Sequence, residues 1–234
     1  MINHDFNIAE VSDGTTIDLY TAFPEGEGEF PAIIVIQEAF GVNGHIRNVC
    51  ERLCAEGYAV VSPDIFHRTA RRFEGSYTDF STVIPHYQAI TNEGLSADLK
   101  ASCDFLAQHK KVISGKTGCV GFCLGGRVSF LANAVLPLAA AVSYYGGGLE
   151  QLTAEAPNLH ADHLFFWGGL DKHITAEKID TIIGAVKQAG KNYTSVTISY
   201  ADHAFSCDER PAYNPLAAKE AWAHTLAFFA NRLK

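Results

Sequence analysis

Six short runs of apolar residues recur along the chain, and their spacing constrains the fold more than any other feature of the sequence. The runs are rich in β-branched and aromatic side chains and cover residues 31–37, 58–64, 118–122, 138–145, 163–168 and 193–200. Their apolar character is continuous rather than alternating, which is typical of strands buried on both faces. Amphipathic helical patterns occur between or after the runs, over residues 46–53, 95–106 and 222–233. Strands that alternate with helices in this way predict an α/β fold, with a mostly parallel central sheet and helices on both faces.

The N-terminal segment predicts an antiparallel hairpin. Residues 6–11 and 16–23 alternate in polarity around Asp13-Gly14, a dipeptide that favours a tight turn. The rest of the chain has no internal repeat, low-complexity tract or linker, so we expect a single domain over residues 1–234. The connection over residues 66–94 is long and carries several aromatic side chains and three arginines. A connection of this length predicts a lid or binding segment, or a short helix of its own.

The overall charge disfavours binding to nucleic acids and to anionic membranes. The chain has 18 lysines and arginines against 26 aspartates and glutamates, a net charge of -8, which repels phosphate groups. The start of the chain lacks a secretory-signal pattern, and no run of about 18 apolar residues predicts a membrane span. The six cysteines form no C-x-x-C pair, so we expect reduced thiols. These features predict a cytoplasmic protein, a monomer or small homo-oligomer, that acts on a small molecule.

A cysteine stands where one predicted strand passes into a helix. In GCVGFCLGGRVSF, residues 118–130, Gly121 and Gly125 surround Cys123 in a G-x-C-x-G pattern. A sharp strand-to-helix turn needs small residues around a nucleophile, and it turns the following backbone N–H toward a developing oxyanion. The helix N-terminus would also stabilise a thiolate at Cys123. The pattern predicts a catalytic thiol, and a structural cysteine packed at a tight turn is the alternative. Cys119, within the strand, is interpreted as a core residue.

A nucleophilic thiol needs a base, and the base needs a carboxylate to orient it. Asp171 follows the fifth of the six predicted strands, and His203 follows the sixth. The order Cys123, Asp171, His203 is the one expected of a nucleophile-elbow fold. Asp202 is a rival acid, but the side chains of neighbouring residues on an extended backbone point apart. His173 lies too close to Asp171 to be its partner for the same reason.

Two further features have both a structural and a functional interpretation. His160 and His163 form an H-x-x-H pattern, but no third ligand accompanies them, so we interpret them as structural and expect no metal. Glu38 lies at the end of a buried run, where a carboxylate is costly unless it is hydrogen-bonded or functional. It is either a turn or helix-cap carboxylate or a charge held beside the thiol.

Five motifs, in this order and spacing, extend over nearly the whole chain and resemble the dienelactone hydrolase (carboxymethylenebutenolidase) family of the α/β-hydrolase fold. They are QEAFGVN (37–43), GFCLGG (121–126), YYGGGLE (144–150), GGLDKH (168–173) and DHAF (202–205). The resemblance implies hydrolysis of an ester or lactone through an acyl-thiol intermediate, without a metal or organic cofactor.

The resemblance also implies a role for each site residue. Cys123 would be the nucleophile, His203 the general base and acid, and Asp171 its orienting partner. Glu38 would contact the resting thiol, and the backbone N–H groups of Leu124 and Ala39 would bind the oxyanion. Candidate substrate contacts lie in or near the matched motifs and in the long connection: Phe40, Tyr145, Phe205, Arg68, Arg71 and Arg72.

The sequence departs from the family where dienelactone enzymes bind a substrate carboxylate. Their arginine four residues after the catalytic histidine is replaced by Cys207, and their second arginine falls where this chain reads FEGSYTDF. A thiol does not replace the paired hydrogen bonds of an arginine, so we expect a different ester or lactone. The alternatives are a thiol redox protein, suggested by Cys50, Cys54 and Cys207, and a ligand-binding protein of the same fold without turnover.

Overall fold

The N-terminal half of the chain is built on a hairpin and the two strands beside it. In the computed structural model, which describes residues 2–234, β1 (Ile2–Glu10) pairs antiparallel with β2 (Thr16–Pro24). β2 pairs antiparallel with β4 (Ala59–Pro63), and β4 pairs parallel with β3 (Phe30–Ile36). Gly14 adopts a φ of 85° in the turn, which glycine tolerates without steric cost. The predicted antiparallel hairpin is therefore confirmed. These strands belong to the first of two compact units, which ends at Gly118.

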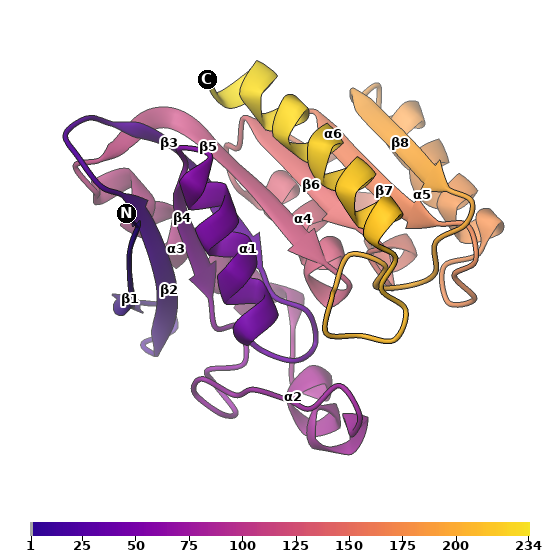
Figure 1. Ribbon diagram of the computed structural model, residues 1–234, viewed down its shortest axis with the longest axis horizontal. Helices are drawn as coiled ribbons and strands as arrows, with labels where there is room; N and C mark the ends of the chain where they lie inside the picture. Colours follow the sequence, from indigo (N-terminus) through magenta and orange to yellow (C-terminus); the bar gives the residue numbers. More distant parts are fainter. Residues whose placement is uncertain (1) are drawn as a thin grey trace. The chain divides into compact units, whose positions relative to one another are not determined.

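Two long helices pack on these strands, one on each face. Figure 1 shows α1 (Gly44–Ala55) in front of β3 and β4, and α3 (Asn92–Gln108) on their far side. Asn43 caps α1 by accepting a hydrogen bond from the N–H of Ile46 at 3.2 Å. The face predicted for this helix is buried, because each of its side chains is at most 2% exposed: Ile46, Val49, Cys50 and Leu53.

The long connection is a folded segment rather than an open loop. It holds the short helices η1 (Phe80–Thr82) and α2 (Ile84–Gln88), and its last residues belong to α3. Figure 1 shows this segment beyond the strand ends of the first unit, around α2. The segment therefore contains the short helix that was one of the expectations, and its role as a lid or binding segment stays a prediction.

The second compact unit runs from Cys119 to Lys234 and contains three parallel strands. β6 (Ala140–Tyr144) pairs with β7 (His163–Gly168), and β7 pairs with β8 (Tyr193–Ile198). β5 (Val112–Phe122) is the strand through which the chain enters this unit, and α4 (Leu124–Val135) follows it after one residue. The remaining helices are η2 (Leu149–Asn158), α5 (Ala176–Gln188) and α6 (Pro215–Leu233). Figure 1 shows α6 in front of β6 and β7, with α4 and α5 behind the strands.

The buried face of α6 differs from the predicted one. The pattern of Trp222, Leu226, Phe229 and Leu233 predicts the apolar face, but Trp222 and Leu226 are only partly buried. The buried positions are instead Ala217, Ala221, Thr225, Phe228, Phe229 and Leu233. Small residues at the centre of this face let the helix approach the strands closely. The Thr225 hydroxyl is accommodated there by hydrogen bonds to the Tyr144 hydroxyl at 2.7 Å and the Ala221 carbonyl at 2.9 Å.

From β3 onward, strands alternate with helices along the chain, as predicted for an α/β fold. Within residues 2–234, no helix is long and apolar enough to cross a bilayer. A single domain, a cytoplasmic location and a monomeric or small oligomeric state stay predictions.

Candidate active site

Cys123 occupies the single residue between β5 and α4. Its φ of 54° and ψ of -113° lie in a region that residues with a Cβ adopt only under strain. The Cys123 N–H donates to the Tyr144 carbonyl at 3.0 Å, and the Cys123 carbonyl accepts from the Gly126 N–H at 3.0 Å. A Cβ at Gly121 would overlap the carbonyl of Gly125, and one at Gly126 would lie 2.5 Å from the Tyr144 carbonyl oxygen. Glycine is therefore required at position 121, as the sequence pattern predicts, and at position 126, one residue beyond the second glycine of that pattern.

The thiol begins a continuous chain of hydrogen bonds through three loops of the second unit. His203 Nε2 lies 3.1 Å from the Cys123 Sγ, and His203 Nδ1 lies 2.7 Å from Asp171 Oδ2. The other carboxylate oxygen, Asp171 Oδ1, accepts the backbone N–H groups of His173 at 2.7 Å and Ile174 at 3.1 Å. The structure thus brings together the three residues that the sequence predicts as nucleophile, base and acid.

Two glycines place Asp171 next to the loop that carries His203. A Cβ at Gly168 would lie 2.7 Å from the Ala201 carbonyl oxygen, and a Cβ at Gly169 would lie 2.6 Å from the Ser199 Cα. The backbones therefore approach closely, and the Leu170 N–H donates to the Ala201 carbonyl at 2.9 Å. The GG pair before Asp171 is needed for this approach.

Asp202 has a different role from Asp171. Its Oδ1 accepts the backbone N–H of His203 at 2.7 Å, so it supports the loop and does not contact the imidazole. The ring of His173 lies 6.0 Å from the ring of His203 and is not its hydrogen-bond partner. Both observations agree with the choice of Asp171 as the orienting acid.

The local charges favour an imidazolium at His203. Burial by itself lowers the pKa of His203, but its hydrogen bonds to Asp171 and Cys123 outweigh burial and raise the pKa to about 10. Burial raises the pKa of Asp171, and the hydrogen bond from His203 together with the two backbone N–H groups brings the pKa below its usual value. A protonated imidazole hydrogen-bonded to both a carboxylate and a sulfur atom can serve as a general acid toward a leaving group.

Tyr145 and Phe205, predicted as substrate contacts, pack beside the imidazole of His203. The ring centroid of Tyr145 lies 5.1 Å from that of His203 and 5.2 Å from that of Phe205. Both aromatic residues are fully buried, and the Tyr145 hydroxyl shares a hydrogen bond of 2.7 Å with Ser206. They support the imidazole by packing, and contact with substrate stays a prediction. Ser206 was not foreseen from the sequence, since no motif marks it.

Glu38, Ala39 and Phe40 follow β3 in the first unit and are buried. The Glu38 carboxylate receives one long hydrogen bond, 3.4 Å from the Tyr77 hydroxyl to Oε2, and Oε1 has no hydrogen-bond partner among the described residues. The Phe40 ring packs against Tyr77 at 4.5 Å. Tyr77, in the long connection, is a contact that the sequence did not predict. The proposed roles of Glu38 and Ala39 toward the thiol stay predictions.

The three candidate arginines of the long connection all form ion pairs. Arg68 donates to both oxygens of Asp98 at 2.8 Å, and Arg71 and Arg72 bind Asp18 at 2.7 and 2.9 Å. Asp18 and Asp98 are at most 1% exposed. These pairs fix the start of the connection to β2 and α3, and binding of a substrate carboxylate by these arginines stays a prediction.

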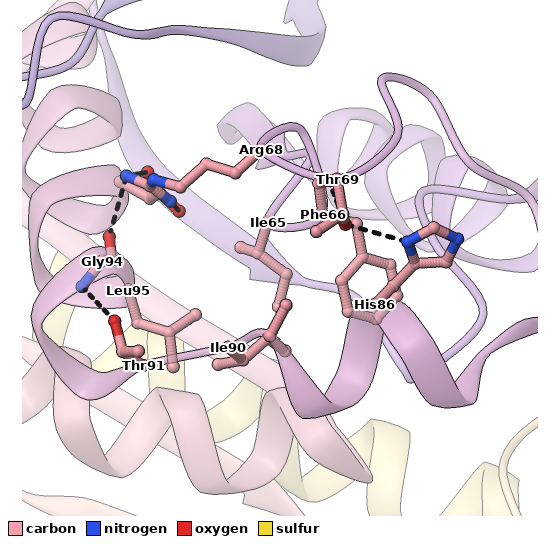
Figure 2. Close-up of a pocket in the computed structure, with 11 residues that line it drawn as sticks. Ile65, Phe66, Arg68, Thr69, His86, Ile90, Thr91, Gly94 and Leu95 are labelled. Atoms are coloured by element: carbon pink, nitrogen blue, oxygen red, sulfur yellow. Dashed lines mark hydrogen bonds and ion pairs between the residues drawn. The ribbon is translucent and has the colours of Figure 1, made fainter.

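A small cavity lies beside Arg68 in this segment. Figure 2 shows Arg68 next to Gly94 at one side of the cavity and His86 hydrogen-bonded to Thr69 at the other. Its volume is about 30 Å³, enough for one or two waters but not for an ester substrate.

Cys50, Cys54 and His163 are buried. Burial raises the pKa of Cys50 and brings that of Cys54 to about 11, so neither is a reactive thiolate near neutral pH. His163 is fully buried and hydrogen-bonded to Asn133 and Ser143. Among residues 2–234, no group of three metal-ligating side chains could hold a metal ion.

Strands that alternate with helices, and a thiol on a strained strand-to-helix turn, define an α/β-hydrolase. The model of the dienelactone hydrolase family matches residues 17–233. The chain therefore belongs to the dienelactone hydrolase family. It is 34% identical over 92% of its length to a protein of Synechocystis named "Putative carboxymethylenebutenolidase", of which 92% is covered. A protein of the same name from Salmonella typhimurium is 32% identical over 94% of this chain and 84% of that protein.

A solved structure agrees with the family assignment. The crystal structure of a "Putative Dienelactone Hydrolase" from Klebsiella pneumoniae superposes with a TM-score of 0.90 at 32% identity, covering 98% of this chain and 99% of that one. The predicted α/β-hydrolase fold and the predicted enzyme class, a hydrolase of ester or lactone bonds, are thereby confirmed.

Proposed function

We propose that the protein hydrolyses a carboxylic ester or lactone through a covalent intermediate on Cys123. The observation that carries the proposal is the hydrogen-bond chain from the Cys123 Sγ through His203 to Asp171, with links of 3.1 and 2.7 Å. A nucleophile, a base within reach of it and a carboxylate that orients the base are the parts that nucleophilic catalysis requires.

The reaction would begin with attack of the Cys123 thiolate on the carbonyl carbon of the substrate. Leu124 is the first residue of α4, so its N–H has no acceptor within the helix and is available to the developing oxyanion. The Ala39 N–H is the second donor expected from the sequence. His203 Nε2 then gives its proton to the leaving alkoxide or enolate as the carbon–oxygen bond breaks, which leaves an acyl group on sulfur.

Hydrolysis of the acyl-thiol would use the same imidazole as a base. Neutral His203 accepts a proton from water, the resulting hydroxide attacks the acyl carbon, and the carbon–sulfur bond breaks. The acid leaves, and the thiolate and imidazolium are restored. Asp171 keeps the proton on Nδ1 throughout and stabilises the imidazolium charge.

The substrate would be an ester or lactone that does not depend on an arginine beside His203. The relatives carry the name "Putative carboxymethylenebutenolidase", which supports a lactone as the first class to test. The buried Cys207 and the ion pairs of Arg68, Arg71 and Arg72 support a substrate other than the dienelactone itself.

A panel of uncharged lactones, carboxylate-bearing lactones and aryl esters tests both parts of the proposal. Cys123→Ala and His203→Ala are expected to lower kcat about 10⁴-fold or more, and Cys103→Ala serves as the matched control because Cys103 lies in α3 outside this site. Mass spectrometry after rapid acid quenching is expected to find the acyl group on the Cys123 peptide. Full activity of Cys123→Ala, or an acyl group on another residue, would refute the proposed nucleophile.

A further inference from the structure

One face of α4 carries two buried polar side chains, although the other buried residues of the helix are apolar or glycine. Gly126, Ser129 and Asn133 lie at helical spacing along it and are fully buried. The Ser129 hydroxyl donates to the Val142 carbonyl of β6 at 2.8 Å. Buried polar groups lower stability unless they are hydrogen-bonded. The hydrogen-bond partners of Ser129 and Asn133 therefore indicate which groups these side chains hold in place.

The orientation of the Asn133 amide is fixed by one backbone residue. Asn133 Oδ1 accepts the Ala161 N–H at 2.8 Å, and Asn133 Nδ2 donates to the Ala161 carbonyl at 2.9 Å. Nδ2 also lies 3.2 Å from His163 Nδ1. Because Nδ2 can only donate, His163 Nδ1 must accept, and the proton of the neutral imidazole lies on Nε2.

This tautomer directs His163 toward the first turn of α4. His163 Nε2 lies 2.8 Å from the Ser143 hydroxyl, which must accept from it and therefore donates its own proton to the Gly126 carbonyl, 2.6 Å away. The Gly126 N–H in turn donates to the Cys123 carbonyl at 3.0 Å. Each hydrogen bond of this chain therefore has one possible direction, and the chain ends at the Cys123 carbonyl, beside the proposed nucleophile.

Packing does not require a histidine at this position. The ring of His163 is stacked on Phe165 at 4.2 Å and lies 5.6 Å from Phe130, so an apolar side chain would suit the same surroundings. Burial lowers the pKa of His163 to about 3, so the imidazole is neutral and cannot act through charge. Its distinguishing property is the directional link to Ser143.

We propose that His163, acting through Ser143, is a positioning residue that holds the first turn of α4 so that the Leu124 N–H faces the developing oxyanion. The inference rests on the proposed role of Cys123 and extends the machinery to β6 and β7. His163 touches neither the thiol nor the other members of the chain from Cys123 to Asp171, so its effect is confined to the direction of the backbone N–H group.

Two reactions of Cys123 separate positioning from a structural role. Ester hydrolysis develops an oxyanion, whereas alkylation by iodoacetamide displaces iodide at a saturated carbon and develops none. In Ser143→Ala, kcat per alkylatable thiol is expected to fall about tenfold, or about 1.4 kcal/mol, with KM and the alkylation rate within about twofold of wild type. Ser129→Ala, which removes another buried hydroxyl from the same face of α4, is the matched control and is expected to change neither rate.

Variants of His163 test the remaining link. His163→Leu is expected to match Ser143→Ala, and the double variant to be no slower, because both break one chain. His163→Gln, whose amide both accepts and donates, is expected to recover most of kcat. A kcat per alkylatable thiol equal to wild type in Ser143→Ala, or an equal fall in Ser129→Ala, would overturn the proposal.

Amide hydrogen exchange gives an answer that does not depend on turnover or on the folding of the His163 variants. The Gly126 and Arg127 amides are expected to exchange faster in Ser143→Ala than in Ser129→Ala, and equal exchange would also overturn the proposal. Turnover by Cys123→Ala would instead refute the proposed function and leave the exchange result unaffected.

Discussion

Replacement of Asp171 by asparagine is expected to reverse the tautomer of His203 while preserving the size of the side chain. In the wild type, Oδ1 accepts two backbone N–H groups, from His173 and Ile174, and Oδ2 accepts the proton on His203 Nδ1. The asparagine carbonyl must take the Oδ1 position, because an amide nitrogen cannot accept two N–H groups. The amide nitrogen then faces His203 Nδ1 as a donor.

The reversed tautomer disfavours the imidazolium beside the thiol. With Nδ1 forced to accept, the imidazole is held neutral with its single proton on Nε2, so it no longer forms the imidazolium that the wild-type site favours 3.1 Å from the Cys123 Sγ. The equivalent change in serine triads lowers kcat about 10⁴-fold, and we expect a loss of this order. The pKa of His203, raised to about 10 in the wild type, is expected to fall, so the alkaline limb of the kcat/KM profile moves to lower pH.

Asp202→Asn is the matched control, because this residue is the neighbouring acid and was the rival from the sequence. Its Oδ1 accepts only the backbone N–H of His203, and an amide oxygen can accept the same bond. We expect a change of less than about threefold in kcat/KM for an aryl ester. The reasoning is refuted if Asp171→Asn keeps more than about one tenth of wild-type activity, or if Asp202→Asn is the slower enzyme.

Four further predictions follow from particular contacts. The free energy of unfolding is expected to be greatest near pH 6.5. The pKa of His163 is lowered to about 3, so below pH 6.5 the unfolded chain takes up a proton that the folded chain does not, and the folded state is destabilised. The pKa of His203 is raised to about 10, so the stability that its imidazolium gives the folded state is lost as the pH rises from 6.5 toward 10. Urea unfolding across this range checks it, and His163→Gln is expected to flatten only the acid side. Gly121→Ala is expected to lower the free energy of unfolding by about 2–3 kcal/mol and to remove most of the activity, because the added Cβ would overlap the Gly125 carbonyl. Gly14→Ala is the control: no atom lies within 4 Å of its added Cβ, so we expect a loss of about 1 kcal/mol from the positive φ and an unchanged kcat. Arg68→Ala removes an ion pair of the buried Asp98 and leaves His67 as its partner, so the free energy of unfolding is expected to fall by about 2 kcal/mol. KM is expected to stay unchanged. A rise in KM confined to carboxylate-bearing substrates would show that Arg68 binds substrate instead. Glu38→Gln is expected from the sequence prediction to increase the rate of Cys123 alkylation near neutral pH, because an anion beside a thiol raises the pKa of the thiol, and an unchanged rate would contradict that prediction.

The strands were predictable because each carries its own signal in a few consecutive residues. Every predicted apolar run corresponds to a strand of the structure, and β7 has the predicted bounds. Helix α5 was not predicted, since only Ile182 and Val186 of its 13 residues are buried and the apolar pattern is correspondingly weak. The face of α6 was misplaced because the bulky Trp222 and Leu226 look like core residues, while close packing favours Ala221 and Thr225.

The site residues were predictable in a different way. The order of Cys123, Asp171 and His203 after successive strands follows from the fold, so position along the chain was sufficient to choose among ten histidines. Partners that come from distant segments left no such signal. Arg71 and Arg72 bind Asp18 across more than 50 residues, and the Asn133–His163–Ser143 network joins α4, β7 and β6 through side chains that share no motif.

Backbone strain in the second unit is concentrated at the proposed site. Of the four residues other than glycine with positive φ among residues 2–234, three are Cys123, Tyr145 and Ala204. Each such conformation costs about 1–3 kcal/mol and persists only where the surroundings determine it. Backbone hydrogen bonds hold all three turns, because the N–H groups of Cys123 and Tyr145 bind the strands beside them and the Ala204 carbonyl accepts the Cys207 N–H at 3.0 Å. The position of the thiol is therefore a property of the packed strands as much as of the motif around it, which is why residues as remote as His163 can be expected to affect catalysis.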